Sequence, residues 1–311
     1  MTSPTRSTAA PRVAVAPAST PSWIADAVRA GGADVVDPAD AEALVWTRPA
    51  DPDGLAQVLA DHRRLAWVQL PWAGVEPYRE VLDQERRWTC GKGVYAEPVA
   101  ELALSLLLAG LRGVGRYARA DHWEDEAGTS LFDARVTVVG GGGIAQALLD
   151  LLTPWRCEVT VVRRHPRPLE GAARVLASDR LHEALPGADG VVLALPVVPD
   201  TVGVVGAAEL ALMEPHAWLV NVARGVHVVT DDLVDALRTD AIGGAALDVT
   251  DPEPLPDGHP LWQLPNCIIT PHVGNTSEMA VPLLGARITE NVRRWAAGED
   301  LLGPVDPTLG Y

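Results

Sequence analysis

Short apolar runs alternate with amphipathic stretches along most of this chain. In the first third, the run Arg12–Ala16 (RVAVA) predicts a buried strand, and the amphipathic segment Ser22–Ala30 predicts a helix. Further strands are predicted over 33–36, 43–47 and 65–70. Strands separated by helical patterns favour a parallel sheet that is covered by helices.

A long apolar segment follows at 99–111 (VAELALSLLLAGL), and Pro98 before it suits the first turn of a helix. The segment is apolar on nearly every helical face, and a helix of this kind is buried. We expect it to lie between domains or between subunits. It is shorter than the roughly 20 residues that a membrane-spanning helix needs.

The alternation of strands and helices restarts after this helix. Six strands with intervening helices are predicted, and six such strands make a complete doubly wound nucleotide-binding domain. These strands cover 136–139, 159–162, 190–195, 218–221, 243–248 and 267–270. A final helix over 281–297 lies beyond the last strand. We expect it to return to the first domain, which makes that domain discontinuous.

A glycine-rich turn joins the strand at 136–139 to the next helix. The pattern is Gly140-x-Gly142-x-x-Ala145. The first glycine allows a tight turn, the second lets the backbone approach a pyrophosphate, and the third position needs only a small side chain. The helix N-terminus then offers N–H groups to the phosphates. Between a strand and a helix, this pattern predicts a dinucleotide site; the alternative is a turn without a ligand.

Two arginines, Arg163 and Arg164, follow the second strand of this domain. A carboxylate at that strand end binds the ribose hydroxyls of NAD, whereas arginine favours a ribose that carries a 2′-phosphate. Arginine pairs with phosphate through charge-assisted hydrogen bonds. We therefore expect NADP(H) to be preferred over NAD(H); the alternative is an exposed basic turn.

Three polar residues follow three later strands: Arg224 in NVARG, Glu253 in DPEP and His272 in TPH. In a doubly wound sheet the loops after the strand ends line one crevice, so these side chains can converge. Arginine binds a carboxylate and polarises a ketone, histidine donates a proton, and a carboxylate stabilises the imidazolium. Each residue alone also fits a structural role, but together with the glycine turn they predict reduction of a 2-keto acid.

Composition narrows the possible partners. The formal net charge is −16, and nucleic acid and anionic membranes both require clustered basic residues. We therefore expect neither as a partner. The N-terminal residues 1–12 lack the apolar core of a signal peptide, and we expect a loose tail there.

The cysteine pattern predicts neither a metal site nor a disulfide framework. The three cysteines are far apart in sequence and odd in number: Cys90, Cys157 and Cys267. We expect reduced thiols in a cytoplasmic protein, and no metal.

The order and spacing of these segments resemble the D-isomer-specific 2-hydroxyacid dehydrogenase family, which includes glyoxylate/hydroxypyruvate reductases. The resemblance is densest over 136–280 and rests on VVGGGGIAQALL, LPVVPDT, NVARG, GGAALDVTDPEPLP and TPHVGNTSEMA. It implies that Arg224 binds and polarises the substrate and that His272 is the acid/base, paired with Glu253. It also implies a homodimer and a cleft between two domains.

We expect a set of cofactor-binding residues, drawn from the residue patterns and from this resemblance. They are Gly140, Gly142, Gly143, Ile144, Arg163, Arg164, Leu195, Pro196, Thr201, Val222, Ala223, Asp248 and Gly274. In the first domain, the segment 69–75 (QLPWAGV) resembles the family loop whose backbone N–H groups hold the substrate carboxylate. The expected substrate-binding residues are Trp72, Ala73, Gly74, Arg48 and Tyr95.

The predicted fold is α/β, with two doubly wound parallel-sheet domains. A Rossmann NAD(P)-binding domain over 97–275 is inserted into a flavodoxin-like substrate domain formed by 1–96 and 276–311. The predicted function is NADPH-dependent reduction of a small 2-keto acid to the D-2-hydroxy acid, of glyoxylate or hydroxypyruvate type. Two alternatives stay open: a phosphite-type dehydrogenase, and a non-catalytic NAD(P)-sensing protein similar to transcriptional corepressors.

Overall fold

The computed structural model describes residues 10–49 and 51–308. Most of the predicted N-terminal tail, residues 1–9, therefore lies outside the described residues. The chain forms two compact units. Unit 1 contains residues 1–95 and 277–311, and unit 2 contains residues 96–276. The sequence predicts these boundaries at 97 and 275.

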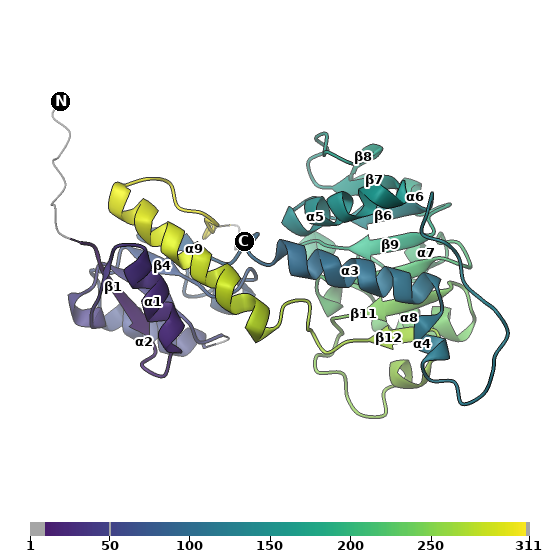
Figure 1. Ribbon diagram of the computed structural model, residues 1–311, viewed down its shortest axis with the longest axis horizontal. Coiled ribbons are helices and arrows are strands. Elements are labelled where there is room, and N and C mark those ends of the chain that lie inside the picture. Colours follow the sequence, from purple (N-terminus) through teal and green to yellow (C-terminus); the bar gives the residue numbers. More distant parts are fainter. Residues whose placement is uncertain (1–9, 50, 309–311) are drawn as a thin grey trace. The chain divides into compact units, whose positions relative to one another are not determined.

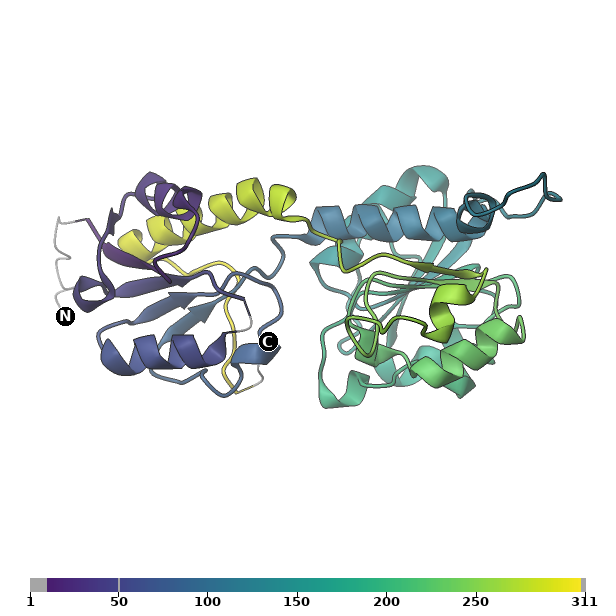
Figure 2. The same ribbon diagram turned by 90° about the horizontal axis from the view of Figure 1, so that it is seen from below.

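Unit 1 is built on a five-stranded parallel sheet in the order β2-β1-β3-β4-β5, which is the flavodoxin-like order. Helices α1 and α9 cover one face, where Ile24 and Ile288 pack with Val45. Helix α2 covers the other face (Figure 2). The elements are β1 (Arg12–Ala16), α1 (Ser22–Ala30), β2 (Asp34–Val35), β3 (Ala43–Trp46), α2 (Pro52–Asp61), β4 (Trp67–Gln69), β5 (Arg87–Thr89) and α9 (Ser277–Ala297).

Unit 2 is built on a seven-stranded parallel sheet in the order β12-β11-β10-β9-β6-β7-β8 (Figure 1). Strand order reverses between β6 and β9, and ligands bind at such a switch point beyond the carboxyl ends of the strands. The strands are β6 (Arg135–Val139), β7 (Glu158–Arg163), β8 (Arg174–Ala177), β9 (Gly190–Leu193), β10 (Trp218–Asn221), β11 (Gly244–Leu247) and β12 (Cys267–Ile269).

Helices cover both faces of the unit 2 sheet. Helices α3 and α5 pack on one face, and α6, α7 and α8 on the other. The first turn of α8 is acidic, with Asp231 and Asp232, which complements the positive end of the helix dipole. The helices are α3 (Ala96–Leu111), α4 (Val114–Tyr117), α5 (Gly143–Leu152), α6 (Leu181–Ala184), α7 (Ala207–Leu210) and α8 (Thr230–Arg238).

The predicted fold class is confirmed, but the predicted strand count is wrong. The sequence predicts six strands in the nucleotide domain, and the sheet of unit 2 has seven. The missed strand, β8, is the short edge segment RVLA. In unit 1 the prediction misses β5, the three-residue segment RWT. Both are too short to show a period of two.

Helix α3 is less uniformly buried within its unit than its composition predicts. One face, including Ala103 and Leu107, is buried against α5 and the sheet. Leu102, Leu104 and Leu108 remain partly exposed. The tertiary structure of unit 2 therefore uses only part of the apolar surface of this helix.

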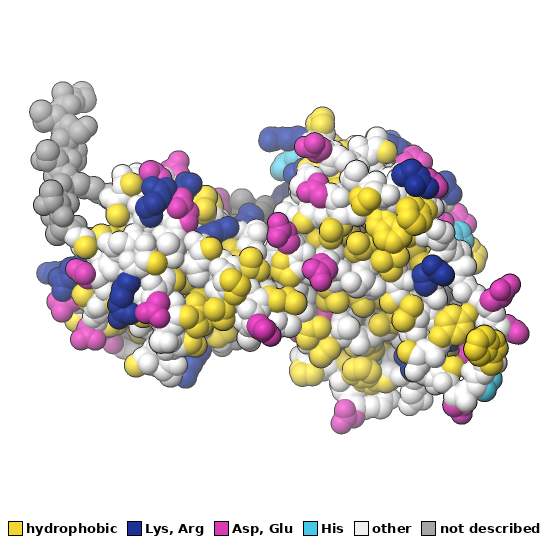
Figure 3. Space-filling model, in the orientation of Figure 1, with side chains coloured by type: hydrophobic (Ala, Val, Ile, Leu, Met, Phe, Trp, Pro, Cys, Tyr) yellow, Lys and Arg dark blue, Asp and Glu magenta, His cyan; other side chains and the backbone are white. Residues whose placement is uncertain are grey.

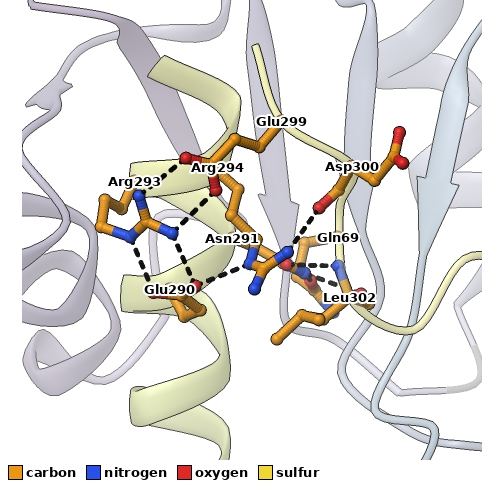
Figure 4. Close-up of polar contacts among 8 residues, drawn as sticks. All are labelled: Gln69, Glu290, Asn291, Arg293, Arg294, Glu299, Asp300 and Leu302. Atoms are coloured by element: carbon orange, nitrogen blue, oxygen red, sulfur yellow. Dashed lines mark hydrogen bonds and ion pairs between the residues drawn. The ribbon is translucent and has the colours of Figure 1, made fainter. Parts of the chain in front are cut away.

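Helix α9 is anchored to the sheet of unit 1 by a buried polar network (Figure 4). The Asn291 amide donates to Gln69 Oε1 at 2.8 Å and to Leu302 O at 2.9 Å, and its oxygen accepts from Leu302 N at 2.7 Å. Asn291 and Gln69 are both 0% exposed. On the outer side of the helix, Arg293 pairs with Glu290 and Glu299. The network joins two segments that are far apart in sequence.

Candidate functional site

The three candidate catalytic side chains follow three neighbouring strands of unit 2. Strands β10, β11 and β12 pair in parallel at one end of the sheet. Arg224 follows β10, Glu253 follows β11 and His272 follows β12. Because neighbouring strands lie about 4.8 Å apart, the three loops start next to one another.

His272 and Glu253 form a direct pair. The distance from His272 Nδ1 to Glu253 Oε1 is 2.7 Å. A carboxylate only accepts hydrogen bonds, so Nδ1 carries the proton in this pair. The pair therefore leaves Nε2 as the ring nitrogen that can exchange a proton with a substrate.

The loop that carries His272 is organised by a buried carboxylate, Asp248, which is 3% exposed. Its Oδ1 accepts hydrogen bonds from Thr270 Oγ1 at 2.6 Å and from Val273 N at 2.9 Å. Its Oδ2 accepts from Gly274 N at 2.9 Å. His272 N donates to the backbone oxygen of Asp248 at 2.8 Å. Asp248 thus fixes the loop on both sides of the histidine.

The loop of Arg224 is fixed by Asn221 at the end of β10. The Asn221 amide donates to Arg224 O at 2.9 Å, and its oxygen accepts from Ala223 N at 3.0 Å. A Cβ at Gly225 would lie 2.0 Å from Thr250 O. Only glycine therefore allows the arginine loop to approach the loop that leads to Glu253. The Arg224 guanidinium donates to Ala223 O at 2.7 Å.

The glycine turn lies at the switch point of the sheet. Gly140 has φ 122°, and a Cβ there would lie 2.0 Å from Ala194 O, so the turn requires glycine. A Cβ at Gly142 would meet nothing within 4 Å. Ala145 is 0% exposed against the sheet. Within the described chain, no side chain caps the start of α5. The open space at Gly142 and the uncapped helix fit a pyrophosphate.

Arg163 lies over this turn. A Cβ at Gly141 would lie 2.7 Å from Arg163 Nε. Arg163 ends β7 and Arg164 follows it at the surface. The structure therefore brings one of the two predicted arginines next to the phosphate turn.

The other expected cofactor residues also follow strand ends. Gly143 and Ile144 begin α5, and the remainder follow β9, β10, β11 and β12: Leu195, Pro196, Thr201, Val222, Ala223, Asp248 and Gly274. A buried histidine, His227, lies beside them and is 0% exposed. Its Nδ1 is 2.8 Å from Thr201 O and its Nε2 is 3.2 Å from Leu195 O. His227 thereby connects the two ends of the loop 195–201.

The expected substrate residues lie in unit 1, each after a strand of its sheet. Trp72, Ala73 and Gly74 follow β4, Arg48 follows β3 and Tyr95 follows β5. Trp72 is 44% exposed. Two of the others have partners within the unit. Arg48 pairs with Asp51 at 3.3 Å, and the Tyr95 hydroxyl donates to Pro71 O at 2.8 Å.

Sequence reasoning missed the residues that hold the site in place. Asn221 and Thr270 stand inside the motifs NVARG and TPH, so their position beside Arg224 and His272 gives a signal. The sequence around His227 gives no such signal, because the partners of this histidine lie 26 and 32 residues away in sequence.

A comparison with protein families identifies the chain. The model described as "D-isomer specific 2-hydroxyacid dehydrogenase, NAD binding domain" matches residues 103–274. The chain belongs to this family. It is therefore an NAD(P)-dependent oxidoreductase that acts on CH–OH groups.

Alignments to individual relatives cover most of the length of this dehydrogenase. A Corynebacterium melassecola protein, named for its position in the proB 3′ region, is 41% identical over 79% of this chain and 84% of its own. Glyoxylate/hydroxypyruvate reductase A of Serratia proteamaculans is 31% identical over 88% of each chain. Among solved structures, a D-isomer specific 2-hydroxyacid dehydrogenase from Xanthobacter autotrophicus Py2, in complex with NADPH and MES, superimposes with a TM-score of 0.84. It is 29% identical and is covered over 100% of its length, against 97% of this chain.

The described residues offer neither a metal-binding cluster nor a helix suited to crossing a membrane. They contain no cluster of three or more His, Cys, Asp or Glu side chains arranged to hold a metal ion. None of their helices combines the length and the apolar character that crossing a membrane requires.

Proposed function

We propose that this dehydrogenase reduces a small 2-keto acid, of glyoxylate or hydroxypyruvate type, to the D-2-hydroxy acid with NADPH. The observation that carries the proposal is the 2.7 Å contact between His272 Nδ1 and Glu253 Oε1. The loops that carry His272 and Glu253 begin next to the loop of Arg224, after neighbouring strands of the sheet. The similarity to a glyoxylate/hydroxypyruvate reductase supports the substrate class.

Each residue has a separate role in the proposed reaction. A bound nicotinamide supplies hydride to the keto carbon. Arg224 binds the carboxylate and polarises the keto oxygen through its guanidinium fork. His272 donates the proton on Nε2 to that oxygen, and Glu253 stabilises the imidazolium through Nδ1. Asp248 keeps the histidine loop in place with its three hydrogen bonds.

The preference for NADPH rests on the end of β7. Arg163 lies over the phosphate turn, and Arg164 follows at the position where a carboxylate would select NAD. A structural relative in complex with NADPH supports this assignment. The two guanidinium groups offer charge-assisted hydrogen bonds to a 2′-phosphate.

The cofactor preference is tested with the double substitution Arg163→Ser and Arg164→Ser. We expect kcat/KM for NADPH to fall at least about tenfold while that for NADH changes little, because each charged hydrogen bond contributes about 1.5–3 kcal/mol. Arg167→Ser, which removes a nearby exposed charge, is the control. A wild type that prefers NADH would contradict the assignment.

In unit 1, we propose substrate-binding roles for the loop 71–74 and for Arg48. We propose that the backbone N–H groups of Ala73 and Gly74 bind the substrate carboxylate. Arg48, which is exposed and paired with Asp51, is proposed to bind a second anionic group. If Arg48→Ala leaves the kinetics of every active acid unchanged, Arg48 has no part in substrate binding.

A panel of 2-keto acids, followed by NADPH absorbance, tests the function itself. We expect turnover with glyoxylate or hydroxypyruvate, and loss of turnover in Arg224→Ala and His272→Ala. Near-normal rates in either variant would refute the mechanism. Tight NADPH binding without turnover of any acid would favour the sensor function, and phosphite-dependent reduction of NADP would favour the phosphite-type enzyme.

We also propose that the dehydrogenase is a homodimer. The face of unit 2 that carries α3 and α5 displays hydrophobic side chains (Figure 3). Exposed apolar residues of this unit include Val114 on α4, Leu151 on α5, and Trp123 and Phe132 between α4 and β6. Contiguous exposed apolar surface is typical of an interface.

A further inference from the structure

The backbone of the loop 71–74 is held from one side by the segment 90–95. The Tyr95 hydroxyl donates to Pro71 O at 2.8 Å. Gly91 N donates to Trp72 O at 2.7 Å, and Cys90 Sγ lies 3.5 Å from Ala73 O. Three successive carbonyl groups of the loop thus have partners in one short segment.

The N–H groups of the same loop are left available. Among the hydrogen bonds of residues 10–49 and 51–308, none uses the N–H of Trp72, Ala73 or Gly74 as donor. Ala73 is exposed and Gly74 is half-buried, so water or a ligand can reach them. Adjacent unpaired backbone N–H groups form an anion-binding concavity.

The segment 90–95 is itself fixed, so it can serve as a support. Arg287 from α9 donates to Cys90 O at 3.2 Å and to Lys92 O at 3.0 Å. At Gly91 the packing is tight, because a Cβ there would lie 3.0 Å from both Pro71 O and Tyr95 Cε2. The loop therefore packs closely on this segment, and an added methyl group at Gly91 would require the neighbouring atoms to shift.

The Tyr95 hydroxyl stays protonated, so it can donate its hydrogen bond to Pro71 O. Burial raises the pKa of Tyr95 to about 12. The hydroxyl therefore keeps its proton at every pH at which the enzyme would be assayed. Its bond to Pro71 O is the side-chain contact that holds the start of the loop.

We propose that Tyr95 is a positioning residue, which sets the loop 71–74 so that the N–H groups of Ala73 and Gly74 bind the carboxylate of the 2-keto acid. This role rests on the proposed function. It differs from the expectation that Tyr95 contacts the substrate, because its hydroxyl already donates to Pro71 O.

The first test is Tyr95→Phe, which removes one oxygen atom. We expect KM for the keto acid to rise about fivefold to tenfold, as for the loss of one hydrogen bond. KM for NADPH should stay the same, which separates this effect from a general loss of structure. Tyr117→Phe removes another tyrosine hydroxyl, which donates to Asp125 O at 3.0 Å and accepts from Ala127 N at 2.6 Å, and it should change neither constant.

The second test is Gly91→Ala, which places a methyl group against both Pro71 O and the Tyr95 ring, the two partners of that hydroxyl bond. We expect it to raise KM for the keto acid as well, because the loop must move away from the new Cβ. If Tyr95→Phe leaves this KM unchanged, Tyr95 does not position the loop, whatever the effect of Gly91→Ala.

Amide NMR separates positioning from contact and does not require turnover. In the wild type, oxamate should shift the amide resonances of Ala73 and Gly74. In ligand-free Tyr95→Phe, the same resonances should differ from those of the wild type. Unchanged resonances in the ligand-free variant, or no shift with oxamate in the wild type, would overturn the inference. An oxamate shift without turnover of any keto acid would leave it standing and refute the proposed reaction instead.

Discussion

His272 and Glu253 keep 48% and 41% of their side-chain surface exposed, so burial does not hold them in place. His272 also has a left-handed backbone, with φ 53°. A residue other than glycine adopts this conformation only when its surroundings enforce it, at about 1–3 kcal/mol. The hydrogen bonds to Asp248 on both sides supply this constraint.

At this scale the substitution Glu253→Gln tests the acid/base pair. We expect kcat to fall about a hundredfold, because an amide does not stabilise the imidazolium as a carboxylate does. Glu209→Gln is the matched control, since Glu209 Oε1 lies 2.6 Å from His182 Nε2 in a second His–Glu pair of unit 2. A Glu253→Gln enzyme with normal kcat would contradict the role of the pair.

A second prediction at this scale concerns the thiols, whose pKa values burial raises. The pKa of Cys157 is raised to about 11 and that of Cys267 to about 12. A raised thiol pKa means less thiolate at a given pH, so at pH 8 Cys157 should carry about a hundredfold less thiolate than a cysteine with the usual pKa of 9.0. Alkylation by iodoacetamide should be slow at pH 8 and accelerate toward pH 11. Rapid labelling at pH 8 before unfolding would disprove this.

At the scale of elements, two junctions are held together by different interactions. The turn from β6 to α5 depends on backbone geometry at the glycines. The attachment of α9 to unit 1 depends on the buried Asn291 network (Figure 4). The glycine pattern predicted the first junction. Nothing in the sequence around Asn291 indicated the second, because its partners Gln69 and Leu302 come from other segments.

Substitutions in the turn should separate folding from cofactor binding. Gly140→Ala places a Cβ 2.0 Å from Ala194 O at φ 122°, and we expect at least about 2 kcal/mol of destabilisation. Gly142→Ala meets nothing within 4 Å, so the melting temperature should stay unchanged while the Kd for NADPH rises sharply. Thermal melts and fluorescence titration measure the two effects. Normal NADPH affinity in Gly142→Ala would exclude the turn as the pyrophosphate site.

The attachment of α9 is tested by Asn291→Leu. The substitution leaves the N–H and C=O of Leu302 without their buried partners, so we expect about 2–4 kcal/mol of destabilisation in urea unfolding. Arg293→Ala on the outer side of the same helix should have a much smaller effect, because its ion pairs are exposed. Equal losses of unfolding free energy in the two variants would show that the buried network stabilises the protein no more than the exposed ion pairs do.

At the scale of the whole molecule, charge acts against the proposed ligands. The net charge of −16 repels both NADPH and an anionic keto acid. The proposed binding therefore depends on local cations such as Arg163, Arg164 and Arg224, and on backbone N–H groups. The absence of a nucleic-acid partner and the cytoplasmic location both stay predictions.

The homodimer is the prediction at this scale. Light scattering after gel filtration should give twice the chain mass of 33.0 kDa. Trp123→Glu, at a side chain that is 99% exposed, should weaken the dimer without affecting the fold of the chain. Trp262→Glu changes another exposed tryptophan and is the control. A monomeric wild type at micromolar concentration would contradict the proposal.

The sequence by itself determined the fold class, the glycine turn and the identity of the three candidate catalytic residues. Hydrophobic periodicity and strand–turn–helix motifs are local, so they are visible along the chain. The tertiary structure decided which side chains hold these residues: Asp248 beneath the His272 loop, Asn221 beside Arg224, and Tyr95 under the loop 71–74. It also decided the short strands β5 and β8. These features depend on contacts between distant segments, which no local pattern encodes.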